Sequence, residues 1–304
     1  CLSRGLGDVY KRQGYIGIYD EELRYKFNNE NGELWAKATL YRVLLGWYEF
    51  NQHKGLLAAV EKAVANVMQA YPINQSHPFQ SVNPNAGGLT HGLVFTDVLE
   101  HLYAVTGNQQ YMDYCLFLYK DFSEQVLNED AQLNKLLNTN LPLKGHGVHT
   151  YEHLRSVVAA CYASGNPMLK TAMDNFLRKI QWVTGPSGGP VGDEFILGRT
   201  ADAALGYEFC SLHELMAGWI SLFAKSGNTN YAGRAEHLLF NAALGATHPT
   251  ESAVCYLKQD NAFFLTGGNN GDTADKHQTR YRYSPVHKEA AVCCVPNAGR
   301  IIPH

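Results

Sequence analysis

Apolar residues recur at helical spacing along most of the chain, and short polar turns or longer loops interrupt them. The first such pattern predicts a helix over residues 33–50. Its apolar positions are Leu40, Val43, Leu44 and Trp47. A second helix is predicted over about residues 54–70, and Pro72 ends the resulting helix hairpin.

Three more hairpins follow at residues 93–122, 148–182 and 212–244, and their turns contain Gly107, Gly165 and Gly227. Glycine supplies the left-handed residue that ends a helix. A spacing of roughly sixty residues is typical of a repeated helix pair with a loop. We therefore predict an all-α fold, an incomplete (α/α)₆ toroid of helix hairpins with a few short strands in its loops. An open solenoid is the alternative.

Four long loops, at residues 72–88, 128–146, 184–206 and 247–288, contain most of the glycines, prolines and histidines. The last loop includes Gly267-Gly268 and a predicted strand over residues 253–257. In a toroid of hairpins the long connections lie at one end and the short turns at the other. Functional residues are therefore expected among the long loops.

Composition narrows the range of functions. Charged residues are 17% of the 304, and the net charge is −3, so no basic surface predicts nucleic-acid binding. No apolar run reaches the length of about eighteen residues that a membrane helix needs. The 18 tyrosines suit a carbohydrate cleft but also an ordinary core.

Both ends of the chain look unnatural. Residues 1–13 resemble translated sequencing-adapter DNA, and the chain stops at Pro303-His304, soon after a Cys-Cys pair. We expect residues 1–13 to be an artefact and residues 14–304 to form one catalytic domain truncated at both ends. The sequence leaves a bacterial cytoplasmic or periplasmic location open.

The cysteines do not follow the spacing of a disulfide-rich module. Glu208-Phe209-Cys210 and Cys293-Cys294 together supply one carboxylate and three thiols, a complete ligand set for tetrahedral zinc. Adjacent cysteines need an unusual backbone to share a metal, which suggests that one thiol takes part in chemistry. A structural zinc site or unrelated buried cysteines remain alternatives.

Two further motifs carry candidate acid/base and binding groups. Asp193-Glu194 follows the glycine-rich residues 185–190, and either carboxylate could act as a general acid/base or be solvated. His146 lies between two glycines at a helix start, where it could contact a bound ligand or cap the helix. Three isolated candidates are His91, Glu236 and Tyr256. Motifs for phosphate transfer, dinucleotide binding, zinc proteases and serine hydrolases are missing.

The ordered motifs resemble one family. Gly-His-Gly-Val, Gly-Asp-Glu, Glu-Phe-Cys, Glu-x-x-Leu-Phe-Asn and Cys-Cys-Val-Pro-Asn-Ala-Gly-Arg resemble the β-L-arabinofuranosidase family of glycoside hydrolases, from about residue 15 to the end. The Cys-Cys-x-Pro-Asn-x-x-Arg signature with an upstream Glu-x-Cys is the specific part. The resemblance implies most of an (α/α)₆ catalytic domain.

The resemblance also implies roles for the candidates. Glu208, Cys210, Cys293 and Cys294 would hold Zn²⁺, with Cys293 also the nucleophile. Glu194 would be the acid/base, and the sugar contacts would be His146, Glu236, Tyr256 and His91.

Three positions depart from the family pattern. Members often have Gly-Glu-Ala-Phe where this chain has Gly-Asp-Glu-Phe, so Asp193 competes with Glu194 for the acid/base role. Gly32 replaces a family histidine, and His149 replaces a frequent arginine.

The resulting hypothesis is a retaining glycoside hydrolase that releases β-L-arabinofuranose or a related sugar from plant-type glycans. A catalytically silent glycan-binding toroid with structural zinc is the alternative, and a sugar epimerase is a third. A carbohydrate is the expected partner, with no nucleic acid and no membrane. A homodimer through the missing C-terminal part remains open.

Overall fold

A computed structural model describes residues 14–26, 30–262, 281, 283 and 293–301. The predictions for residues 1–13, 267–271 and 303–304 lie outside these described residues. The chain divides into two compact units. Unit 1 comprises residues 1–128 and 159–169, and unit 2 comprises residues 129–158 and 170–304.

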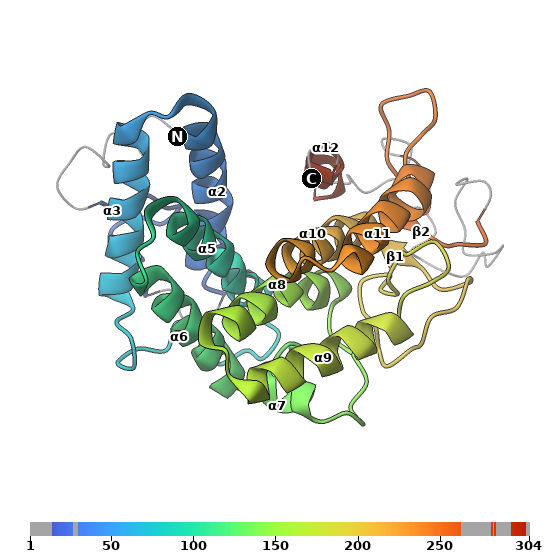
Figure 1. Ribbon diagram of the computed structural model, residues 1–304, viewed down its shortest axis with the longest axis horizontal. Coiled ribbons are helices and arrows are strands. Elements are labelled where there is room, and N and C mark those ends of the chain that lie inside the picture. Colours follow the sequence, from blue (N-terminus) through green and yellow to red (C-terminus); the bar gives the residue numbers. More distant parts are fainter. Residues whose placement is uncertain (1–13, 27–29, 263–280, 282, 284–292, 302–304) are drawn as a thin grey trace. The chain divides into compact units, whose positions relative to one another are not determined.

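Unit 1 contains two helix hairpins (Figure 1). The first pairs α2 (Glu33–Asn51) with α3 (Lys54–Ala70), and the second pairs α5 (Phe95–Thr106) with α6 (Gln110–Glu124). The short helix α4 (Gly87–Thr90) and the 3₁₀ helix η1 (His91–Val94) lead into α5. Helices α2 and α5 also pack on each other.

Helix α2 forms where the sequence predicts it, but its buried face differs from the predicted stripe. Its fully buried apolar side chains are Ala38, Tyr41 and Leu45. Val43 and Trp47 are 66% and 57% exposed. Apolar residues occupy more than one face of α2, so spacing alone could not tell which face packs against α3 and α5.

Unit 2 begins with α7 (Leu133–Leu137), inside a predicted loop, and the first part of α8 (Gly147–Ser164). Most of α9 (Pro167–Trp182) follows, then α10 (Phe209–Ser226), α11 (Thr229–Leu238) and the π-helix η2 (Leu239–Ala243). Helix α12 (Cys294–Ile301) packs on α10 (Figure 1). The second helix of the predicted hairpin 212–244 is therefore α11 followed by a π-helical turn.

The three Gly-Asn turns share one hydrogen-bonding scheme. Gly107, Gly165 and Gly227 have φ of 70°, 61° and 66°, and each amide donates to the carbonyl four residues earlier. In the last turn the Ser226 hydroxyl accepts from the Asn228 amide at 3.1 Å, and Asn228 Oδ1 accepts from the Asn230 amide at 3.0 Å. The predicted left-handed glycine and helix-starting polar residue are both confirmed.

Two short strands lie among the loops of unit 2, as predicted. Strand β1 (Tyr207–Glu208) pairs antiparallel with β2 (Leu257–Lys258), which is later than the predicted residues 253–257. Because β1 runs directly into α10, the pairing fixes the start of that helix. None of the helices that the structure describes is both long and apolar enough to cross a membrane.

Candidate active site and metal cluster

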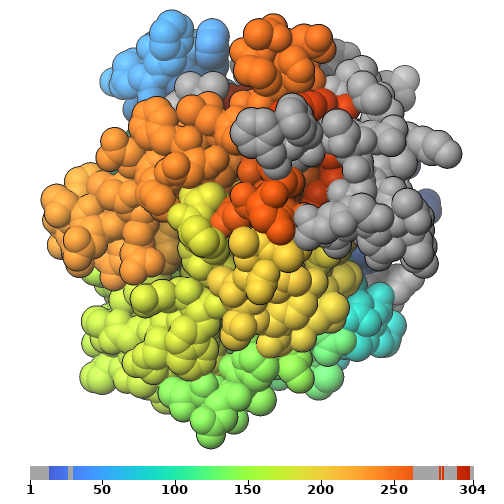
Figure 2. Space-filling model, turned by 90° about the vertical axis from the view of Figure 1, so that its right-hand side faces the viewer, coloured from blue at the N-terminus to red at the C-terminus, as the bar shows by residue number. Residues whose placement is uncertain are grey.

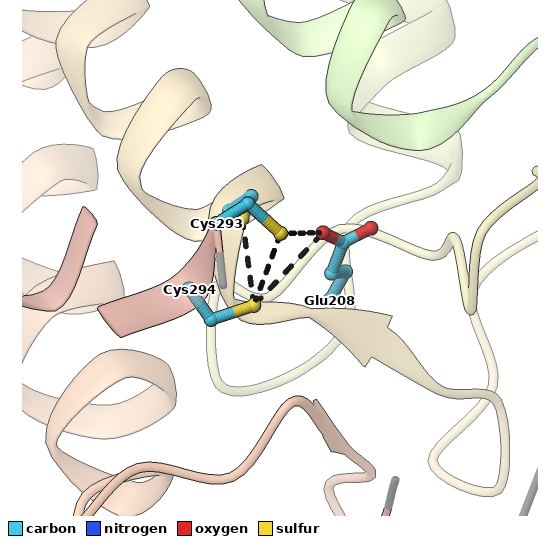
Figure 3. A group of neighbouring side chains, drawn as sticks. Glu208, Cys293 and Cys294 are labelled. Carbon is cyan, nitrogen blue, oxygen red and sulfur yellow. Dashed lines mark hydrogen bonds between the residues drawn. The ribbon is translucent and has the colours of Figure 1, made fainter. Parts of the chain in front are cut away.

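The two cysteine motifs meet where α10 and α12 begin. Glu208 is the N-cap of α10, Cys210 lies in its first turn, and Cys294 is the first residue of α12. The sulfurs of Cys210 and Cys294 are 3.4 Å apart, and those of Cys293 and Cys294 are 3.9 Å apart. Cys293 Sγ lies 3.6 Å from Glu208 Oε1 (Figure 3). Segments some eighty residues apart in sequence thus form one four-donor cluster.

The distances between these donor atoms suit a tetrahedral zinc ion. With zinc–sulfur bonds of about 2.3 Å and a zinc–oxygen bond of about 2.1 Å, tetrahedral angles place sulfurs about 3.8 Å apart and sulfur about 3.6 Å from oxygen. The four donor atoms of the cluster all lie within 4.8 Å of one another. Their chemistry and spacing therefore fit zinc.

The four donors crowd acidic groups into a small and mostly buried space. Burial, followed by the Cys293 thiolate, raises the pKa of Glu208 to about 8. Glu208 Oε2 is buried and has no hydrogen-bond partner among the described residues. Hydrogen bonds with Cys210 and Cys294 hold the pKa of Cys293 far below its ordinary value. A bound divalent cation would favour the deprotonated forms of these donors and neutralise their charge.

Two glycines bring the other predicted motifs together. A Cβ on Gly147 would lie 3.3 Å from the Cα of Gly192, and a Cβ on Gly192 would lie 3.1 Å from the Cα of Gly147. The Gly147 amide donates to the carbonyl of Glu194 at 2.7 Å. The lack of a side chain at Gly147 accommodates another backbone segment. This close approach places His146 beside Glu194.

Glu194 has hydrogen-bonding partners at both carboxylate oxygens. His146 Nε2 lies 3.1 Å from Oε2, and the Tyr256 hydroxyl donates to Oε1 at 3.0 Å. Burial raises the pKa of Tyr256, so the hydroxyl stays protonated as a donor. Donor atoms of His146, Glu194 and Glu208 lie within 4.8 Å of one another. The Glu194 carboxylate and the cysteine cluster therefore adjoin each other across Glu208.

The backbone at Glu194 is strained. Its φ is 93°, a region that residues other than glycine rarely adopt. Such a residue costs about 1–3 kcal/mol and persists only where surrounding contacts enforce it.

Asp193, the competing carboxylate, lies in a different environment. Its Oδ1 accepts a hydrogen bond from Arg199 Nη2 at 2.5 Å. Neither His146 nor Tyr256 bonds to Asp193 in the described part of the chain. Two adjacent carboxylates thus have separate partners.

Several supporting residues carried no signal in the sequence. Asp130 accepts from the Gly145 amide at 2.8 Å and from the Thr150 hydroxyl at 2.9 Å, which joins the loop before His146 to α8. His149 Nδ1 lies 2.9 Å from Glu129 Oε1, and its ring lies 4.7 Å from that of His146. His149 stands near His146 in the sequence and departs from the family pattern, but no local signal points to its partner, which is twenty residues earlier.

A second aspartate, Asp260, anchors the loop that carries Glu194. Asp260 Oδ1 accepts from the Ser187 hydroxyl at 2.5 Å and from the Tyr207 hydroxyl at 3.0 Å. Gln259 Nε2 donates to the carbonyl of Ala204 at 2.6 Å, so residues 184–206 and 253–262 lie side by side (Figure 2). The aspartate thus links the glycine-rich stretch to β1.

Two predicted sugar contacts have other surroundings in the structure. Glu236 is exposed on α11, and within the described part of the chain no hydrogen bond or ion pair connects its side chain to the cluster. His91 belongs to unit 1, where its ring stacks on Trp35 at 4.2 Å. The proposed sugar-binding roles of Glu236 and His91 stay predictions.

The family model for the β-L-arabinofuranosidase GH127 catalytic domain matches residues 5–304. The chain belongs to this family. No curated protein sequence matches the chain. The GH127 membership confirms the resemblance on which the site residues were assigned.

Solved structures share the fold. A GH127 β-L-arabinofuranosidase from Geobacillus stearothermophilus T6 has a TM-score of 0.73 and 14% identity, over 96% of this chain and 48% of its own. A second GH127 β-arabinofuranosidase has a TM-score of 0.56 and 15% identity, and the match covers 93% of this chain and 55% of that enzyme. A D-mannose isomerase has a TM-score of 0.52 and 14% identity, and the match covers 89% of this chain and 71% of the isomerase.

These similarities establish an all-α fold of the (α/α)₆ toroid class, as predicted. At such low identity they support the fold alone. The chain spans about half the length of the first of these GH127 enzymes.

Proposed function

We propose that this GH127 member is a retaining glycoside hydrolase that releases β-L-arabinofuranose, or a related sugar, from plant-type glycans. The observation that carries the proposal is the position of Glu208, whose carboxylate adjoins both the three thiols and the Glu194–His146 pair. A candidate nucleophile and a candidate acid/base thus face one small space.

Cys293 has the properties of a nucleophile. It is the exposed member of the three thiols, whereas Cys210 and Cys294 are buried. Its lowered pKa favours the thiolate, the reactive form of cysteine. When zinc is bound by Glu208, Cys210, Cys293 and Cys294, it would keep the thiols deprotonated and stabilise the sulfur as a leaving group.

Glu194 fits the acid/base role better than Asp193. Its carboxylate is oriented by His146 and Tyr256, whereas Asp193 is paired with Arg199. In the first step Cys293 Sγ attacks the anomeric carbon, the bond to the leaving oxygen breaks, and Glu194 gives that oxygen a proton. In the second step water attacks the same carbon, Glu194 takes the water proton, and the carbon–sulfur bond breaks. Two displacements retain the anomeric configuration.

The test is hydrolysis of aryl β-L-arabinofuranosides by the zinc-loaded protein, with the anomer of the first-formed sugar followed by NMR. We expect turnover with retained β configuration, and turnover lost in Glu194→Gln. An inverted product would contradict the two-step mechanism. Glycan binding without turnover would favour the silent binding protein, and an isomerised sugar without hydrolysis would favour the epimerase.

A further inference from the structure

Arg199 binds a side chain before Glu194 and two backbone carbonyls after it. Its Nη2 donates to Asp193 Oδ1 at 2.5 Å and also to the carbonyl of Phe195. Its Nε donates to the carbonyl of Ile196 at 3.0 Å. One guanidinium therefore binds the residue before Glu194 and the two residues after it.

The loop that Arg199 closes has an unusual backbone. Glu194 and Leu197 have φ of 93° and 57°, and Gly192 and Gly198 at its ends have φ of 151° and 75°. Two residues other than glycine in the left-handed region within so few positions need external support.

One side of the loop is held by main-chain bonds to residues 143–147, which lead into α8. The Gly147 amide donates to the Glu194 carbonyl at 2.7 Å, and the Ile196 amide donates to the Gly145 carbonyl at 3.0 Å. The Gly198 amide donates to the Leu143 carbonyl at 2.8 Å. Arg199 supplies side-chain bonds to other groups of the same loop, so both sets of contacts determine where the Glu194 carboxylate points.

We propose that Arg199 is a positioning residue for the acid/base carboxylate. Its three bonds keep Glu194 in the strained conformation that directs its carboxylate to His146 and Tyr256. Its ion pair also keeps the Asp193 carboxylate engaged elsewhere, so that one carboxylate of the adjacent pair serves as proton donor. The inference rests on the proposed function to the extent that Glu194 transfers the proton.

A displaced proton donor affects substrates unequally. Aglycones that leave as poor anions need protonation, whereas dinitrophenolate leaves without it. We expect Arg199→Met to lower kcat roughly 10–100-fold for poor leaving groups, because small misplacements of catalytic groups have effects of this size. Dinitrophenyl substrates should be little affected in the first step, and KM should change little.

Two variants and a control sharpen this test. Arg199→Lys keeps the charge but loses the planar fork of donors, so partial recovery is expected. Asp193→Asn removes only the ion pair and should show the same dependence on leaving group with a smaller loss. Arg178→Met, on α9 with its guanidinium bonded to Asn175, is the matched control and should retain wild-type kinetics. An equal loss for good and poor leaving groups would overturn the proposal.

Hydrogen exchange gives a readout that does not depend on activity. Arg199→Met should speed exchange at the amides of Gly147, Ile196 and Gly198, while the amides of α10 stay protected. Unchanged exchange at those three amides would overturn the proposal. A wild-type protein inactive on every aryl sugar would refute the proposed function, and the exchange measurement would still decide whether Arg199 holds the loop. Asp193→Asn serves both measurements if Arg199→Met does not fold.

Discussion

At the residue scale, adjacent side chains in this site have opposite environments. Cys293 is exposed and Cys294 is buried, although they are neighbours in sequence. Asp193 pairs with Arg199, whereas Glu194 meets His146 and Tyr256. In each pair the two residues have different surroundings, because consecutive side chains point in different directions.

Cys293→Ser should abolish turnover while leaving the fold largely intact. A serine hydroxyl has nearly the same shape but is not ionised near neutral pH, so no comparable nucleophile remains. Steady-state rates with aryl arabinofuranosides and the thermal midpoint would be compared with wild type. Cys255→Ser is the matched control, because this buried thiol lies outside the four-donor cluster and should retain activity. A fully active Cys293→Ser protein would exclude the mechanism.

Cys210→Ala should lose bound zinc together with activity. Removing one of four ligands leaves an incomplete coordination shell, and Glu208 and Cys294 alone cannot replace the missing sulfur. Elemental analysis of the purified protein would measure the metal content. Cys115→Ala, a buried cysteine of α6, should keep its zinc. Unchanged zinc in the Cys210 variant would refute the ligand assignment.

At the element scale, the helix ends are the best-determined features. The three Gly-Asn turns repeat one local scheme, so sequence alone sufficed to place them. Helix α10 is 18 residues long, about 27 Å. Its N-terminal end carries Glu208 and Cys210, and its C-terminal end carries the Gly227 turn. As predicted, the candidate site and the short turn lie at opposite ends of this helix.

Substitution of Gly227 by alanine should lower the free energy of unfolding by about 1–2 kcal/mol. The added Cβ meets no other atom, but φ of 66° disfavours any residue with a Cβ. Gly233→Ala, within the neighbouring helix α11, is the matched control. Its Cβ also meets nothing, so it should raise the free energy of unfolding by about 0.5–1 kcal/mol. Denaturant unfolding measures both, and equal effects in both variants would contradict the turn assignment.

At the scale of the whole molecule, the metal site joins segments that are far apart in sequence. Cluster residues come from the starts of α10 and α12, and the neighbouring His146 and Glu194 come from two further loops. A cation bound there would stabilise the native state, because the unfolded chain does not bring these ligands together.

Zinc should raise the thermal midpoint of the protein, and chelation should lower it. Free zinc at about a thousand times its dissociation constant would add about 4 kcal/mol to the free energy of unfolding. Magnesium, which prefers oxygen ligands, should have no such effect. Scanning calorimetry with zinc, magnesium and chelator would measure these shifts. A midpoint insensitive to zinc and chelator would contradict the proposed cluster.

The sequence by itself determined the helix hairpins, their left-handed glycine turns and the residue types of the cluster. These depend on local spacing and on motifs that contain their own chemistry. Only the tertiary structure decided which face of α2 is buried, that Arg199 holds the loop at Glu194, and that Asp130 and Glu129 support the histidines. Those choices depend on contacts between residues distant in sequence, whose partners no local pattern reveals.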